Sequence, residues 1–194
     1  MDSASKRHRR SIRLPHYDYS QSGVYFITVC VQHQRCLFGD VIDGSIVLRD
    51  LGKIVAAEWR RTAEIRSNVG VDEFVVMPNH LHGLLVIEAF RRGVSHTPSD
   101  RFHSPAQSLG AIVRGFKAST TRLINEFQGT PGLMLWQRNY YEHVVRNDDE
   151  LRCIREYIAN NPAQWAVDRE NPEEGVYQYA PTDGIEKIFG GSRP

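Results

Sequence analysis

One stretch decides the fold: V-M-P-N-H-L-H-G-L-L-V-I (Val76–Ile87). Pro78 and Asn79 stand between two runs that are rich in apolar and β-branched residues, which is typical of paired strands. Proline at the second position of a turn fixes φ, and asparagine at the third position tolerates a left-handed conformation. The stretch therefore predicts a tight antiparallel hairpin, whose second strand begins with His80 and carries His82 two residues later.

The sequence on either side predicts further strands and helices within one unit. Apolar periodicity, turn residues and cap residues mark each element. The predicted elements are a strand from Val24, a hairpin turn at Asp43-Gly44, a helix over 50–66, a helix that follows Ser108 and stops at 129–132, a strand or extended edge over 135–145, and a helix over 148–160. Helices interspersed among such strands indicate an α+β fold with one antiparallel sheet and helices on one face.

The helix over 148–160 has the clearest boundaries. Asn147 and Glu150 have the spacing of a capping box, acidic residues fill the first turn, and Asn161-Pro162 ends the helix. Tyr157 and Asn161 are four residues apart, so they lie on the same side of the helix.

Length and composition limit the class of protein. A chain of 194 residues with 41% hydrophobic and 24% charged residues is typical of one globular domain, and no apolar run reaches the roughly 18 residues of a membrane span. Three cysteines without metal-ligand spacing suit reduced thiols. We therefore expect a cytoplasmic protein that does not contact a membrane.

Charge is unevenly distributed although the net charge is only +1. Arginine outnumbers lysine 20 to 4, which suits phosphate recognition but also a GC-rich genome. Residues 1–20 form a basic arm that includes Arg9 and Arg10, and residues 166–194 form an acidic tail. Because DNA is an anion, we expect its path to avoid that tail.

His80 and His82 point to one face of their strand, with Cβ atoms roughly 6–7 Å apart, whereas Leu81 points to the other face. Two imidazoles at this distance can bind one metal ion. The alternative interpretation is a pair of ordinary polar residues at the start of a strand.

Tyr157 and Asn161 suggest the rest of a site. The amide oxygen of Asn161 is a possible third metal ligand, and a phenol beside a metal-bound phosphate is a possible nucleophile. The alternatives are that Tyr157 borders the apolar stripe of its helix and that Asn161 only ends that helix before Pro162.

Two segments resemble a known family. Val76–Ile87 resembles the His-hydrophobic-His signature of the HUH single-strand endonucleases, and W-Q-R-N-Y-Y-E-H-V-V-R-N-D-D-E-L-R-C-I-R-E-Y-I-A-N-N-P (Trp136–Pro162) resembles the C-terminal half of the REP-associated tyrosine transposases. The match extends over roughly residues 20–165. It implies a ferredoxin-like antiparallel sheet and a catalytic domain over 21–165, interrupted by a mobile loop at 90–107.

The resemblance also implies an activity. In this family the two histidines bind Mg²⁺ or Mn²⁺ and the tyrosine attacks DNA, which assigns these roles to His80, His82 and Tyr157, with Asn161 as third ligand. Cleavage would leave a 5′-phosphotyrosine and a free 3′-OH at hairpin-forming single-stranded repeats, so that rejoining needs no ATP. The protein would be a DNA transposase of the nucleoid, a monomer or homodimer. Candidate DNA contacts are Arg114, Lys117, Arg122, Arg138, Arg9 and Arg10.

Other interpretations remain open at this point. Tyr140 and Tyr141 are rival nucleophiles, although neither has an amide partner four residues on. The protein could also bind DNA hairpins without cutting them, or it could be a metal-dependent hydrolase in which water attacks.

Overall fold

The structure, a computed structural model, describes residues 21–88, 108–168 and 170–172. The predicted basic arm with Arg9 and Arg10, the predicted loop at 90–107 and most of the predicted tail lie outside these residues. Within the described ranges, no helix combines the length and apolar character that crossing a membrane requires.

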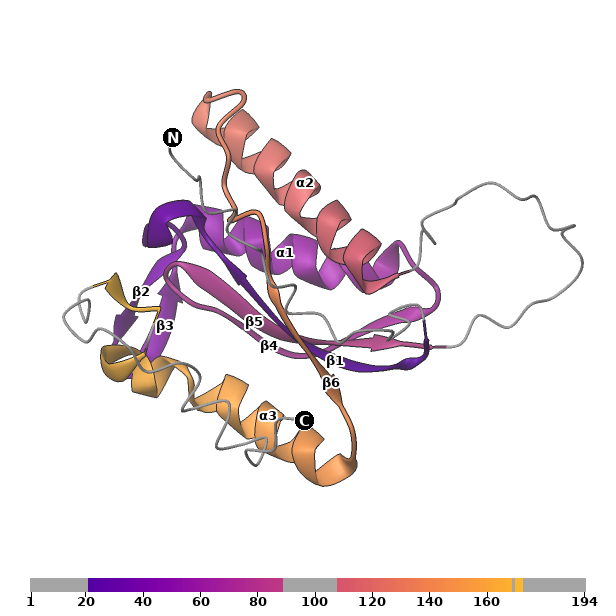
Figure 1. Cartoon of the computed structure of the whole chain (residues 1–194). Helices are drawn as coiled ribbons and strands as arrows, with labels where there is room; N and C mark the ends of the chain where they lie inside the picture. The colour runs from indigo at the N-terminus through magenta and orange to yellow at the C-terminus, as the bar shows by residue number, and fades with distance from the viewer. Residues whose placement is uncertain (1–20, 89–107, 169, 173–194) are drawn as a thin grey trace, which may run out of the picture.

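The centre of the molecule is a four-stranded antiparallel sheet with the order β4-β5-β1-β6 (Figure 1). Its strands are β1 (Gly23–Cys30), β4 (Val69–Val76), β5 (His80–Ile87) and β6 (Tyr141–Val145). A separate ribbon consists of β2 (Gly39–Ile42) and β3 (Ser45–Leu48). The strand that begins with His80 is therefore one of the two central strands of the sheet.

Both predicted hairpin turns are confirmed. Asp43 and Gly44 join β2 to β3 with φ values of 50° and 72°, the left-handed pair that such a two-residue turn requires. The Met77 N–H donates to the His80 carbonyl at 2.8 Å and closes the turn between β4 and β5. Asn79 is not among the described residues with positive φ, so the expected left-handed conformation is absent there.

The helices are α1 (Asp50–Glu64), α2 (Leu109–Gln128) and α3 (Asp148–Asn160), with short 3-10 turns at Gln32–Gln34 and Pro162–Val167. The hydroxyl of Ser108 caps α2, which ends at Gly129 with φ 66°. The Asn147 side chain accepts from the Glu150 N–H at 2.8 Å, as the capping motif predicts. The Glu150 carboxylate accepts from the Arg146 N–H rather than from Asn147, so only half of the capping box is formed.

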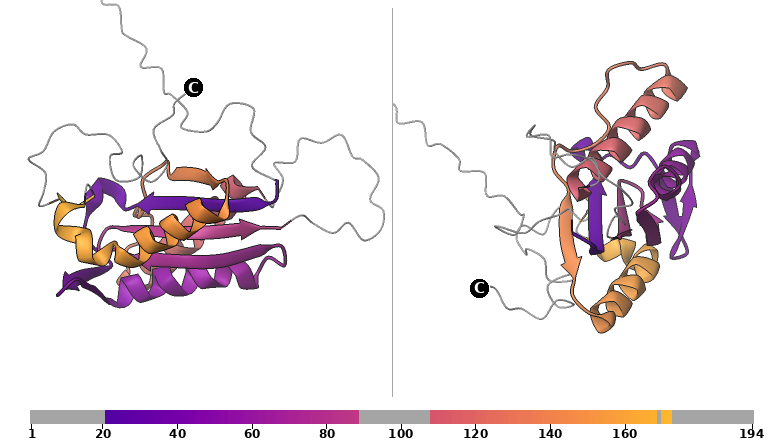
Figure 2. Two further views of the ribbon diagram at one scale, coloured as in Figure 1. Left: turned by 90° about the horizontal axis from the view of Figure 1, so that it is seen from below. Right: turned by 90° about the vertical axis from the view of Figure 1, so that its right-hand side faces the viewer.

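The helices cover both faces of the sheet (Figure 1; Figure 2). Helices α1 and α2 pack on one face over a large core, and α3 packs on the other over a smaller cluster. We call the residues Phe26, Leu84, Ile154 and Ile158 the small cluster. The predicted α+β class is confirmed, but the prediction that helices lie on one face is wrong for α3. Because strand side chains alternate between faces, β1 and β5 present apolar residues on both sides.

Two contacts position α3. The Arg155 guanidinium donates to both carboxylate oxygens of Asp72 on β4, at 3.0 and 2.5 Å. At the N-terminal end of the helix, the Glu150 carboxylate contacts His143 Nε2 on β6 at 2.9 Å. Helix α3 is therefore tied to both edge strands, and its inner side faces the central strand β5.

Candidate metal and tyrosine site

The two histidines lie side by side on the α3 face of β5. Their ring centroids are 4.4 Å apart, and their side chains are 0% and 2% exposed. Leu81 between them points to the opposite face and belongs to the large core. The alternation predicted from the sequence therefore brings His80 and His82 together in a buried position.

The Nδ1 atom of each imidazole contacts a neighbouring polar side chain. His80 Nδ1 contacts Asn79 Oδ1 at 2.8 Å, and His82 Nδ1 contacts Thr28 Oγ1 at 2.8 Å. His80 Nε2 is buried and has no hydrogen-bond partner among the described residues. Metal-binding histidines commonly bind a second residue through the nitrogen that does not bind the metal.

Burial keeps both imidazoles neutral. It lowers the pKa of His80 well below its ordinary value, with a smaller contribution from His82, and it lowers the pKa of His82 to about 3. A neutral imidazole has the free lone pair that metal binding requires.

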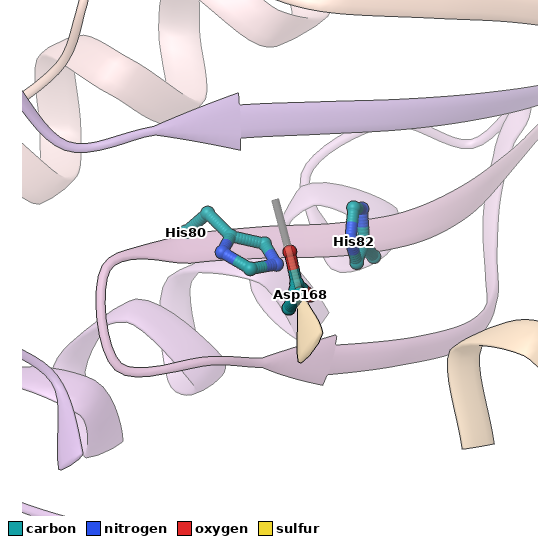
Figure 3. A group of neighbouring side chains, drawn as sticks. All are labelled: His80, His82 and Asp168. Atoms are coloured by element: carbon teal, nitrogen blue, oxygen red, sulfur yellow. The ribbon is translucent and has the colours of Figure 1, made fainter. Parts of the chain in front are cut away.

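Asp168 lies beside the two rings (Figure 3). One ligand atom from each of His80, His82 and Asp168 lies within 4.8 Å of the other two. Burial, chiefly, raises the pKa of Asp168, and its Oδ2 is buried without a hydrogen-bond partner in the described part of the chain. Asp168 lies in the predicted acidic tail and was not predicted as a candidate ligand, because no local spacing relates it to the histidines.

Asn161 also lies in this group, directly after α3. Its side chain is 2% exposed, and it lowers the pKa of Tyr157 and of Asp168 against the larger effect of burial, which raises both. Its Oδ1 is buried and lacks a partner within the described ranges. The predicted third ligand is thus next to Tyr157 and Asp168, which lie beside the histidines.

These atoms fit a divalent cation. His80 Nε2, Asp168 Oδ2 and Asn161 Oδ1 are buried acceptors without partners in the described ranges, an arrangement that is costly unless a ligand satisfies it. Imidazole nitrogens with carboxylate and amide oxygens form a mixed donor set that suits transition metals, and the oxygens suit Mg²⁺ or Mn²⁺. The residues His80, His82 and Asp168, with Asn161 beside them, could hold such an ion.

The Tyr157 side chain extends from α3 towards the candidate metal ligands. Its hydroxyl lies 3.4 Å from His82 Nε2, and its ring meets Phe26 edge-on with centroids 6.0 Å apart. Burial raises the pKa of Tyr157 most, and the carboxylates of Asp168 and Glu170 raise it further. The phenol therefore stays protonated unless a nearby cation offsets these effects.

The rival tyrosines occupy different positions. Tyr141 begins β6, and its ring packs edge-on against Phe26 at 6.2 Å, next to the small cluster. Tyr140 packs against the large core, with the Lys117 ammonium 5.4 Å from its ring centroid. The hydroxyl of Tyr157, by contrast, has a direct contact with a candidate metal ligand, His82.

Three of the predicted DNA contacts that the structure describes lie on the other side of the sheet from this site. Arg114, Lys117 and Arg122 are on α2, which covers the opposite face of the sheet. Lys117 donates to the carbonyls of residues 137 and 139 at 3.0 and 2.9 Å, and burial lowers its pKa to about 8. Arg122 pairs with Glu126, and Arg114 is exposed, as is Arg138.

Comparison with solved structures identifies the fold. The structure of a REP-associated tyrosine transposase bound to a REP hairpin is similar with a TM-score of 0.54 and 18% identity, over 87% of this chain and 90% of that one. A putative transposase from Deinococcus radiodurans has a TM-score of 0.43 and 17% identity, over 76% and 95% of the two chains. The first likeness shows that this chain has the fold of a tyrosine transposase.

Sequence comparison defines the family. A protein of Haemophilus influenzae described as uncharacterized is 40% identical over 173 residues, which are 86% of this chain and 95% of that protein. The chain belongs to the same family as this Haemophilus protein. No protein-family model matches the chain.

Proposed function

We propose that this protein is a metal-dependent single-stranded DNA endonuclease and transposase that cleaves and rejoins DNA at hairpin-forming repeats. The observation that carries the proposal is the contact between Tyr157 Oη and His82 Nε2 at 3.4 Å, inside a group of buried ligand atoms. A nucleophile beside a metal site is the arrangement that attack on a phosphodiester needs.

Tyr157 is the proposed nucleophile. A bond forms between its Oη and the DNA phosphorus, and the bond from phosphorus to the 3′ oxygen breaks. The phenol loses its proton and the departing 3′ oxygen gains one, so that a 5′-phosphotyrosine and a 3′-OH result. The reverse attack by a 3′-OH rejoins the strand without ATP, since the phosphotyrosine preserves the energy of the bond.

The remaining residues bind and orient. His80, His82 and Asp168 would hold Mg²⁺ or Mn²⁺, which supplies positive charge to the scissile phosphate and to the developing phenolate. Asn161 lowers the pKa of Tyr157 and so favours its ionised form, against the larger effect of burial. Phe26 limits how the phenol ring can tilt, since the two rings pack edge-on. The catalytic unit of this proposal is residues 21–165 together with Asp168, which lies outside that predicted range.

The DNA partner of the proposal is a single-stranded hairpin. The similar solved structure is a REP-associated tyrosine transposase bound to a REP hairpin, which supports this class of substrate. Exposed Arg138 and the basic arm with Arg9 and Arg10 are the proposed phosphate contacts, since arginine binds phosphate with two parallel hydrogen bonds. Arg114 on α2 is a further candidate, but Lys117 and Arg122 already bind groups of the protein itself.

A covalent adduct tests the proposal. The full chain is incubated with a labelled hairpin oligonucleotide and Mn²⁺, and the products are separated under denaturing conditions. We expect a protein–DNA band with the unmodified chain and none with Tyr157→Phe. A cut product without an adduct would instead support hydrolysis by water. Binding without cutting would support a hairpin-binding protein, and an adduct retained by Tyr157→Phe but lost in Tyr141→Phe would assign the attack to Tyr141.

A further inference from the structure

Asn79 directly precedes His80 of the candidate metal site, and both polar atoms of its side chain make hydrogen-bonding contacts. It is 1% exposed. Its amide nitrogen donates to the Gln34 carbonyl at 3.1 Å and to the Glu170 carbonyl at 2.5 Å, and its Oδ1 lies 2.8 Å from His80 Nδ1. One buried amide thus connects three segments that are far apart in the sequence.

These contacts determine the orientation of the amide. Backbone carbonyls can only accept hydrogen bonds, so the nitrogen of Asn79 must face Gln34 and Glu170. Its oxygen then faces His80 and can only accept. The proton of the neutral His80 ring must therefore be on Nδ1, which leaves the lone pair on Nε2, the buried atom without a partner in the described residues.

The same amide acts on a second candidate ligand through Glu170. The Glu170 backbone N–H donates to Asp168 Oδ1 at 2.7 Å, while Asp168 Oδ2 is left as a buried acceptor with no partner in the described part of the chain. The Glu170 carboxylate is held as well, because it accepts from Gln34 Nε2 at 3.0 Å. Asn79 and Gln34 thus both hold Glu170, the residue whose backbone N–H donates to Asp168.

The backbone conformation does not explain why position 79 is an asparagine. The residue does not have the positive φ that asparagine tolerates in turns. What this position uses is an acceptor and two donors on a short side chain, which aspartate, serine and alanine cannot supply together.

We propose that Asn79 is a positioning residue that orients two metal ligands at once, the imidazole of His80 and, through the backbone of Glu170, the carboxylate of Asp168. The inference rests on the proposed metal-dependent function. Residues behind metal ligands typically change metal affinity about 10- to 100-fold when they are replaced.

The test measures Mn²⁺ binding by the full chain without DNA, from the loss of the free-ion signal in electron paramagnetic resonance. We expect Asn79→Ala to weaken binding about 10- to 100-fold. Asn79→Asp has the same size and still accepts from His80 but presents a carboxylate to two carbonyls, so we expect a comparable loss. Circular dichroism gives the folded fraction of each variant, and affinities are compared per folded molecule.

Thr120→Val is the matched control for lost stability. Thr120 is fully buried in the large core, where its hydroxyl donates to the Phe116 carbonyl and accepts from Trp136 Nε1, both at 2.8 Å. Its replacement by valine removes both of these hydrogen bonds on the other face of the sheet. We expect Mn²⁺ affinity to stay within about twofold of the unmodified chain, because distant and independent sites do not couple.

A double-mutant cycle tests the link through Glu170. If Asn79 acts partly through Asp168, the loss caused by Asn79→Asp will be smaller when Asp168→Asn is already present. Equal losses in both backgrounds would overturn that link. Mn²⁺ affinity within twofold of normal in both Asn79 variants would overturn the whole inference while leaving the metal site intact. Failure of the unmodified chain to bind Mn²⁺ would overturn the proposed metal site and this inference with it.

Discussion

The two faces of the sheet are made by the same strands and differ in size and chemistry. The face under α1 and α2 carries a large apolar core that includes Trp59, fully buried against Gly83. The face under α3 carries the small cluster together with both histidines, Tyr157 and Asp168. Burial on the first face stabilises the fold, and this allows the second face to keep buried polar atoms without partners in the described chain, which would otherwise be costly.

Tyr157→Phe should abolish DNA cleavage at the face under α3 and leave the large core under α1 and α2 unchanged. We expect adduct formation to fall at least about 10⁴-fold, because the nucleophile is gone. Stability should change by about 1 kcal/mol or less, since only one hydroxyl contact is lost. Single-turnover cleavage and urea unfolding measure the two effects. The control is Tyr141→Phe, which should keep most of the activity.

Leu84 and Leu85 are adjacent, both fully buried, and point to opposite faces of β5. Replacing either one with alanine should cost about 2–5 kcal/mol in unfolding free energy. Only Leu84→Ala should also slow cleavage by the folded protein, because it removes packing from under the helix that carries Tyr157. Cleavage rates of the two variants, measured at a temperature at which both remain folded, test this difference. Equal slowing by both variants would contradict a functional division between the faces.

Mn²⁺ should stabilise the protein through the second face only. At a concentration about 100 times its Kd, a ligand that binds only the folded state contributes about 2.7 kcal/mol. Thermal unfolding with added Mn²⁺ and with a chelator measures the shift. We expect His82→Ala to abolish it and Thr120→Val to keep it. A shift that persists in His82→Ala would place the bound metal elsewhere.

Asp72→Asn should have the smallest effect, because solvent screens its pair with Arg155, whose side chain is 49% exposed against 23% for Asp72. The Arg155 hydrogen bonds hold the pKa of Asp72 below its usual value of 3.8. A lowered pKa in the folded state stabilises the protein above that usual value, and the contribution disappears as pH falls through the folded-state pKa. Urea unfolding should therefore show a small deficit for the variant at pH 7 that vanishes in strong acid. A deficit that grows in acid would contradict the ion pair.

Local signals predicted most of the fold. The Asp43-Gly44 turn, the Ser108 cap and the end of α2 at Gly129 each depend on a few neighbouring residues, and the structure has all three. The start of β4 was harder to predict. The strand begins at Val69, and a register shift between Val71 and Phe74 interrupts the alternation that a sequence pattern can detect.

The candidate site was also predicted only in part from local sequence signals. Spacing alone places His80 with His82 on one face of a strand, and Tyr157 with Asn161 on one side of a helix, because strand and helix periods are local properties of the backbone. The neighbours of Asn79 depend on segments 45 and 91 residues away along the chain.

By itself, therefore, the sequence determined the class of fold and two halves of a site. Only the tertiary structure decided that α3 packs opposite α1 and α2, that Tyr157 meets His82, and that Asp168 lies beside the imidazoles. The reason is physical. Periodicity states which side chains share a face, but contact between faces depends on how the apolar surfaces of distant segments are buried together, and no local pattern contains that information.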